Sequence, residues 1–193
     1  RAFGTVIDEL YWRFRHWSFG DRWRDDYVSP AALAHPHRTL LVDAVARYAP
    51  LGSILEVGCA AGTNLFLLAK RFPAARLYGT DVSQRILDRG RSWLREQGIT
   101  NAELTRAPAH NLSTFADKSV DVVFTDAVLI YVGPDRSGRA LREMARVARK
   151  AVILCELHVD AAMPIRRDHW IHNYRELLAP FVQPDAIRFS KIP

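Results

Sequence analysis

Cysteine and long apolar runs are both scarce in this chain. Only two cysteines, Cys59 and Cys155, occur among 193 residues, which excludes a disulfide scaffold and fits a reducing, cytoplasmic compartment. The strongly apolar runs 120–124 and 151–154 are far too short to cross a bilayer, so we expect no membrane partner. The first residue is Arg1, so we expect the native start to lie upstream, and no signal-peptide pattern remains.

The charge balance is basic, with 27 lysines and arginines against 21 acids. A net charge of +6 makes nucleic acid the first partner to consider. Most of the surplus lies in residues 136–150, where Arg139, Arg142, Arg146 and Arg149 follow helical spacing beside a separate apolar stripe. We interpret this pattern as a solvated helix face rather than a phosphate-binding track.

The N-terminal fifty residues are rich in aromatic and arginine side chains. Apolar residues at Val6, Leu10, Phe14 and Trp17 have the spacing of an amphipathic helix, so we expect Phe14 and Trp17 to pack in the core. We expect residues 1–50 to form a helical cap on a domain spanning 51–193, the whole being one structural unit.

From Ser53 onward, short apolar strands alternate with helices. The predicted strands are Ser53–Val57, Arg76–Thr80, Ala102–Thr105, Val120–Thr125 and Ala151–Cys155. The predicted helices between and after them are Gly62–Arg71, Gln84–Gln97, Arg136–Ala148 and Arg167–Leu178, and residues 186–191 predict one more strand. This order indicates an α/β fold with a doubly wound, mostly parallel sheet and helices on both faces. Its ligand should bind beyond the carboxyl ends of the strands.

The segment 54–64 combines a buried strand, a loop of small residues and the start of a helix. Gly58 permits a tight turn, and Ala60 and Gly62 allow a ligand to approach the backbone. Asp81 follows the next strand, where a carboxylate can accept both hydroxyl protons of a ribose. Glu56 lies inside the apolar strand end, so it needs a partner such as loop amides or a cationic group of a ligand.

The pattern Glu56-x-Gly58-x-Ala60-x-Gly62 followed by Asp81 resembles the first two motifs of class I S-adenosylmethionine-dependent methyltransferases. Later segments resemble that family as well, at 109–112, 117–123 and 142–147. Residues 128–135 are similar to methylases associated with pseudaminic acid biosynthesis. A nicotinamide dehydrogenase fits less well, because Ala60 stands where its fingerprint needs glycine.

The resemblance implies S-adenosylmethionine as cofactor, with S-adenosylhomocysteine as product. The residues expected to bind it are Glu56, Gly58, Cys59, Ala60, Gly62, Asp81, Val82, Ala109, His110, Thr125 and Ala127. By the same resemblance, the loop holds the methionine part and Asp81 the ribose. Val82 packs on the adenine, whose edge Ala109 and His110 border. The sulfonium is flanked by Thr125, Asp126 and Ala127. One departure concerns the adenine amino group, for which family members often supply an acid after the third strand. This chain has Ala107-Pro108-Ala109 there, so a backbone carbonyl or His110 would substitute.

A proton acceptor is needed only if the methyl acceptor must lose a proton. His158 and Asp126 are the candidates, the first as a base or a surface histidine, the second as an orienting group or a helix cap. For substrate contacts we expect Tyr11, Trp12, Tyr27 and Tyr131.

Two further features are considered as ligand sites: Arg38, and the histidine pair His169 and His172. Arg38 could pair with the cofactor carboxylate, but we favour a structural role. We expect no metal, since His169 and His172 have no third ligand nearby.

These features predict a methyltransferase that modifies an oxygen or nitrogen nucleophile of a small molecule. One alternative is an RNA or protein methyltransferase that uses the arginines of 136–150. Another is a non-catalytic partner subunit that only binds the cofactor. The methyl acceptor and the oligomeric state do not follow from the sequence.

Overall fold

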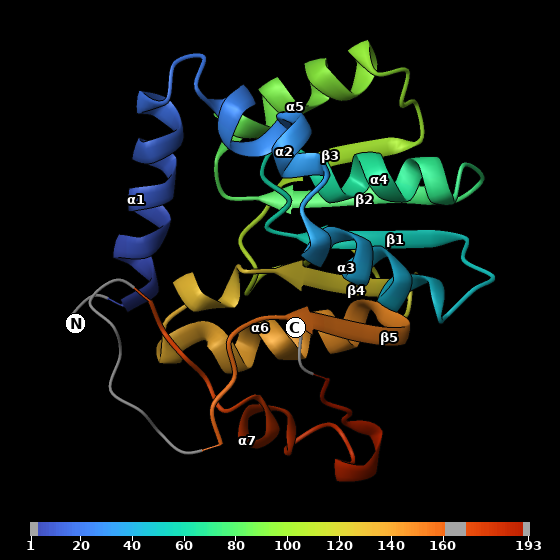
Figure 1. The fold of residues 1–193 in the computed structure, drawn as a ribbon. Coiled ribbons are helices and arrows are strands. Elements are labelled where there is room, and N and C mark those ends of the chain that lie inside the picture. Colours follow the sequence, from blue (N-terminus) through green and yellow to red (C-terminus); the bar gives the residue numbers. More distant parts are fainter. Residues whose placement is uncertain (1–3, 161–168, 191–193) are drawn as a thin grey trace.

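A five-stranded sheet in the order β3-β2-β1-β4-β5 forms the centre of the fold (Figure 1), and every neighbouring pair is parallel. The computed structural model describes residues 4–160 and 169–190. The strands are β1 Ser53–Val57, β2 Arg76–Asp81, β3 Ala102–Arg106, β4 Val120–Asp126 and β5 Ala148–Cys155.

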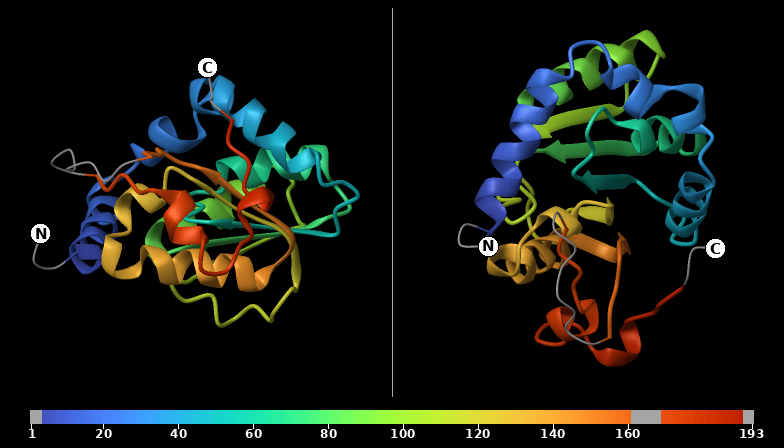
Figure 2. Two further views of the ribbon diagram at one scale, coloured as in Figure 1. Left: turned by 90° about the horizontal axis from the view of Figure 1, so that it is seen from below. Right: turned by 60° about the vertical axis from the view of Figure 1, so that its left-hand side comes forward.

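Helices cover both faces of this sheet (Figure 2). They are α1 Gly4–Ser18, α2 Pro30–Leu33, α3 Pro36–Ala46, α4 Thr63–Arg71, α5 Gln84–Glu96, α6 Pro134–Val147 and α7 Tyr174–Leu178. Short helical turns occur at Arg24–Val28, Leu129–Tyr131 and Pro184–Ala186. Among the described residues, each helix is too short or too polar to span a lipid bilayer.

The core has two halves because successive strand side chains point to opposite faces. Ile54 and Phe124 belong to the half beneath α3, α4 and α5, whereas Leu55 and Val123 belong to the half beneath α6. The predicted parallel sheet with helices on both faces is therefore confirmed.

Helix α1 stands across the carboxyl ends of the strands, with α5 at one end and α6 at the other (Figure 1). Its orientation differs from the prediction, because Phe14 and Trp17 are 66% and 64% exposed. The side that faces the sheet carries Glu9, Trp12 and His16 instead. The prediction was wrong because α1 packs over an open crevice, which Glu9, Trp12 and His16 line, and so leaves Phe14 and Trp17 on its other side.

The C-terminal elements also differ from the prediction. Strand β5 starts at Ala148, three residues before the predicted start at Ala151, because Ala148 pairs with Val120. Helix α7 begins only at Tyr174, and residues 167 and 168 lie outside the described residues. The strand expected at 186–191 is wrong for its described part, since Phe189 packs against His158 and Arg175 rather than joining a sheet.

Candidate functional site

A crevice of about 290 Å³ lies between α1 and the carboxyl ends of β1, β2 and β4. It remains open rather than being filled by the protein's own side chains. Its lining residues come from the cap, the strand ends and the loops after them: Glu9, Trp12, His16, Tyr27, Arg38, Glu56, Gly58, Cys59, Ala60, Thr63, Asn64, Asp81, Val82, Ala107, Ala109, His110, Asp126, Ala127, Val128, Tyr131 and Val132.

The loop between β1 and α4 has a backbone that few residues tolerate. Gly58 has φ +77°, and a Cβ there would collide with the side chain of Val128. Ala60 and Ala127 also adopt positive φ, at 46° and 53°, which is strained for a residue with a side chain. Both line the crevice, and backbone strain of this kind concentrates at functional sites.

Asp81 joins two loops at the end of β2. Its Oδ2 accepts a hydrogen bond from the Ala60 N–H at 3.1 Å, and Oδ1 accepts one from the Ser83 N–H at 2.9 Å. The residue is only 9% exposed, and burial raises the pKa of Asp81 to about 6. Each oxygen retains a lone pair for a further donor, so the carboxylate can accept two hydroxyl groups of a ligand.

Glu56 is a buried carboxyl group that forms no ion pair within residues 4–160 and 169–190. Oε1 accepts a hydrogen bond from Asn64 Nδ2 at 2.7 Å, but Oε2 is buried and has no hydrogen-bond partner among the described residues. Burial raises the pKa of Glu56 to about 8. A cationic ligand group beside Oε2 would stabilise the ionised form, so this site fits the ammonium or sulfonium group of S-adenosylmethionine.

Asp126 lies at the end of β4 among donors from three neighbouring side chains. Its Oδ2 is 3.0 Å from His37 Nε2, 3.0 Å from Asn64 Nδ2 and 3.6 Å from Arg38 Nη1. Asn64 therefore links Asp126 to Glu56, and Arg38 Nη1 donates to Asn64 Oδ1 at 2.6 Å. Four side chains of this network line the crevice, namely Arg38, Glu56, Asn64 and Asp126.

Four rings cover the crevice and form what we call the aromatic roof: Trp12, His16, Tyr27 and Tyr131. The Trp12 ring lies 4.7 Å from that of Tyr131 and 5.3 Å from that of His16. His16 Nε2 is 3.0 Å from the Tyr27 hydroxyl. Burial lowers the pKa of His16 to about 4, so this imidazole is neutral at physiological pH.

The structure brings most of the sequence-derived candidates together. Those that line the crevice are Trp12, Tyr27, Glu56, Gly58, Cys59, Ala60, Asp81, Val82, Ala109, His110, Asp126, Ala127 and Tyr131. Gly62 and Thr125 do not line it. Gly62 adopts φ +81° at the start of α4 and faces Leu94, and Thr125 is fully buried within β4.

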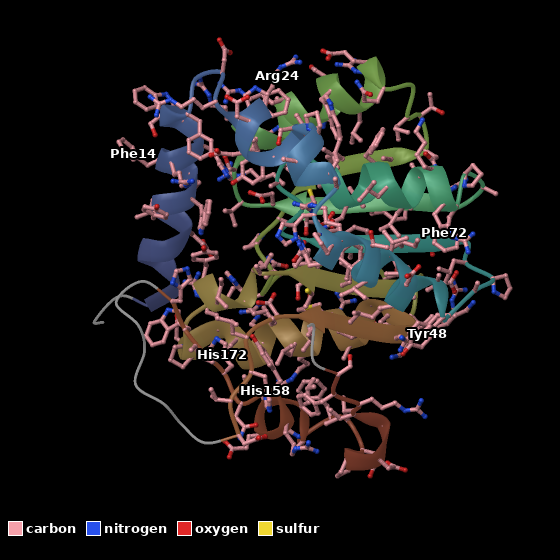
Figure 3. The ribbon with its side chains drawn as sticks, viewed as in Figure 1. Phe14, Arg24, Tyr48, Phe72, His158 and His172 are labelled. Carbon is pink, nitrogen blue, oxygen red and sulfur yellow. The ribbon has the colours of Figure 1, made fainter. Side chains whose placement is uncertain are left out.

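Two candidates lie elsewhere and correct the prediction. Tyr11 is on the outer side of α1, beside Phe14 and Arg15, because it is one residue out of phase with Trp12. His158 lies near α7 (Figure 3), where it contacts Asp160, the Tyr174 N–H and the Phe189 ring. The chain beyond β5 leads His158 away from α1, so it is not placed to act on a ligand in the crevice.

Sequence reasoning missed four residues that line the crevice, namely Glu9, His16, Thr63 and Asn64. It also missed the contact between His37 and Asp126. Glu9, Trp12 and His16 are three and four residues apart, so helical spacing could have grouped them. Thr63 and Asn64 are polar residues that directly precede the apolar run 65–69 of the same helix, which is a usable signal. Arg38 was considered, but its position at the crevice depends on tertiary packing.

Three of the five arginines of 136–150 form ion pairs within the molecule. Arg146 contacts Glu143 and Asp117 as well as two main-chain carbonyls, Arg136 pairs with Glu9, and Arg149 pairs with Asp121. Residues 4–160 and 169–190 contain no group of three or more His, Cys, Asp or Glu side chains arranged to hold a metal ion.

Comparison with known proteins agrees with this geometry. Residues 54–151 match the family described as "Methyltransferase domain". A trans-aconitate 2-methyltransferase of Variovorax paradoxus is 28% identical over 149 residues, which cover 72% of this chain and 52% of that protein. An uncharacterized 37.1 kDa transposon protein of Streptomyces fradiae is 33% identical over 126 residues, covering 64% of this chain and 34% of the relative. The chain thus spans about a third to a half of these curated relatives.

Solved structures support the same fold. The magnesium protoporphyrin IX methyltransferase of Synechocystis PCC 6803, crystallised with S-adenosylmethionine, superposes with a TM-score of 0.69 at 19% identity, over 90% of this chain and 85% of that one. The parallel sheet, the glycine-containing loop and the acid that ends β2 are typical of nucleoside-binding α/β proteins. The chain belongs to the methyltransferase domain family, among the class I enzymes whose cofactor is S-adenosylmethionine.

Proposed function

We propose that this protein transfers the methyl group of S-adenosylmethionine to an oxygen or nitrogen nucleophile of a small molecule. The observation that carries this proposal is the single crevice shared by Asp81, Glu56 and Asp126 and covered by the aromatic roof. A relative that is named for methylation of trans-aconitate supports the small-molecule class.

The charges in the crevice fit the parts of the cofactor. Asp81 accepts hydrogen bonds from the ribose hydroxyls, and the loop 58–60 approaches the methionine part. Glu56 Oε2, which is buried and unpartnered, faces the cationic portion. Arg38 can pair with the cofactor carboxylate, since its guanidinium lines the same crevice.

Methyl transfer from a sulfonium needs alignment of the nucleophile and exclusion of water more than it needs a strong base. The roof excludes water, and Trp12, Tyr27 and Tyr131 supply flat surfaces against the methyl acceptor. Asp126 and Ala127 follow β4 at the same edge of the sheet. Asp126 is therefore our candidate for orienting the acceptor or receiving its proton.

The alternative of RNA methylation depends on arginines that are free to bind phosphates. Because Arg136, Arg146 and Arg149 already pair with carboxylates, their face is less suited to a phosphate backbone. We therefore favour the small-molecule reaction over the RNA reaction. The labelling experiment below distinguishes the small-molecule reaction from the alternative of a non-catalytic partner subunit.

The first experiment is calorimetric titration with S-adenosylhomocysteine. Asp81→Ala is expected to weaken binding by about 1.5–3 kcal/mol, the usual cost of losing hydrogen bonds to a charged group. Asp88→Ala, on the exposed side of α5, is the matched control and should bind like the wild type. No binding to the wild type would refute the proposal.

The second experiment uses a cofactor labelled in its methyl group with fractionated cell extract. Label in a small molecule supports the proposal. Label in RNA or protein favours the first alternative. Tight cofactor binding without any labelled product leaves the non-catalytic partner.

A further inference from the structure

Glu9 is a carboxylate that α1 brings into the crevice. It lines the same crevice as Val82, Ala107 and Ala109, and it lies beside His110. Its Oε1 lies 3.2 Å from Arg136 Nη1 and 3.5 Å from His110 Nδ1. One oxygen is thus fixed by α6, and Oε2 is left with its lone pairs.

His110 stands beside Glu9 with a defined tautomer. Arg136 Nη1, which can only donate, faces His110 Nε2 at 3.5 Å, so Nε2 accepts and the ring proton lies on Nδ1. Burial lowers the pKa of His110, which keeps the ring neutral. The Nδ1 atom is itself buried and forms no hydrogen bond with a described residue, since Glu9 Oε1, at 3.5 Å, is only an ion-pair neighbour.

This edge of the crevice therefore presents an acceptor, Glu9, next to a donor, His110 Nδ1–H. Its complement is a flat ring with an amino group beside an unprotonated ring nitrogen, and adenine has that arrangement at its 6-amino group and N1. The loop after β3 supplies no acid at this edge, because residues 107–109 are Ala-Pro-Ala.

We propose that Glu9 of α1 recognises the 6-amino group of the cofactor's adenine, with His110 donating to the neighbouring ring nitrogen. The N-terminal helix then forms part of the cofactor site as well as its cover. This inference rests on the proposed function, because it requires the cofactor to occupy the crevice with its ribose at Asp81.

The consequence is discrimination between adenine and hypoxanthine. Hypoxanthine carries a carbonyl oxygen in place of the amino group and a proton on N1. Glu9 would then face an oxygen, and His110 Nδ1–H would face another N–H. Two mismatched groups at a largely buried edge should lower affinity by about 10- to 100-fold.

The test compares S-adenosylhomocysteine with S-inosylhomocysteine by calorimetric titration. Wild-type protein is expected to prefer the adenine compound by at least about 10-fold. Glu9→Gln, whose amide can donate to a carbonyl, should remove most of that preference. Asp81→Asn should weaken both compounds by the same factor and leave the ratio unchanged, since the ribose is common to both.

One outcome would overturn the role of Glu9 alone, and another would overturn the proposed function. A Glu9→Gln protein that loses affinity for both compounds equally shows that Glu9 only ties α1 to Arg136. Absence of S-adenosylhomocysteine binding to the wild type refutes the proposed function itself. Thermal unfolding of each variant, monitored by circular dichroism, checks that the measured protein is folded.

Discussion

His37 Nε2 lies 3.0 Å from Oδ2 of Asp126, so a side chain at the start of α3 is bonded to the carboxylate that ends β4. The same oxygen faces Asn64 and Arg38. Helix α3, which precedes the sheet in sequence, is thereby fixed to the crevice by polar contacts as well as by its apolar face.

Removal of the Asp126 carboxylate should destabilise the fold. Asp126→Ala leaves Arg38, whose side chain is 14% exposed, without its nearest carboxylate. We expect a loss of about 2 kcal/mol in the free energy of unfolding, measured by urea denaturation. Asp88→Ala, which breaks the exposed pair with Arg91, should cost under about 1 kcal/mol. Equal losses would show that the Asp126 network adds no more than a surface pair.

Glu56 should make the ligand-free protein less stable as pH rises. The folded-state pKa is about 8, above the ordinary value of 4.5, so the folded protein holds a proton that the unfolded chain releases. The free energy of unfolding should therefore fall as pH rises from about 4.5 to about 8, by at most roughly 1.4 kcal/mol per pH unit, and level off above pH 8. Glu56→Gln keeps the acceptor for Asn64 and removes the titration.

Urea unfolding of both proteins over this pH range provides the test. The variant should lack the decline and be more stable than the wild type near pH 8. Its affinity for S-adenosylhomocysteine should be lower, because the anionic partner of the cationic group is gone. Parallel pH profiles for the two proteins would contradict this assignment of the proton.

The sequence predicted the parts of the site that depend on local order along the chain. Gly58, Ala60 and Asp81 lie in one strand-loop-helix-strand unit, whose geometry follows from parallel pairing of β1 with β2. The family match, over residues 54–151, includes that unit. The loop and the acid after β2 could therefore be predicted without coordinates.

The cap could not be predicted in the same way. Hydrophobic spacing assigned Phe14 and Trp17 to the core, but α1 covers an open crevice, where Glu9 pairs with Arg136 and His16 contacts the Tyr27 hydroxyl. Glu9 and His16 face inward for that reason, and Tyr11 faces out. His158 was misplaced because the direction of the chain after β5 depends on packing against α7.

Cofactor affinity should fall as pH decreases through about 6. Burial raises the pKa of Asp81 to about 6 in the ligand-free protein, and ribose hydroxyls donate to the ionised carboxylate. Below that pH, binding must first displace a proton from Asp81, so affinity should drop by a further factor of at most about ten per pH unit, in addition to the decline that protonation of Glu56 causes below about pH 8. Titration with S-adenosylhomocysteine should show this step in the wild type. Asp81→Asn should bind more weakly and lack the step, and an undiminished step would assign it to another group.

Two tryptophans of α1 offer a matched comparison of its faces. Trp17 is 64% exposed and stacks on Phe14, so Trp17→Ala should change the free energy of unfolding by under about 0.5 kcal/mol. Trp12 packs between Tyr131 and His16 over the crevice. Trp12→Ala should cost about 3 kcal/mol and also weaken S-adenosylhomocysteine binding. Urea denaturation and calorimetry measure the two effects, and a larger loss for Trp17→Ala than for Trp12→Ala would reverse the orientation assigned to α1.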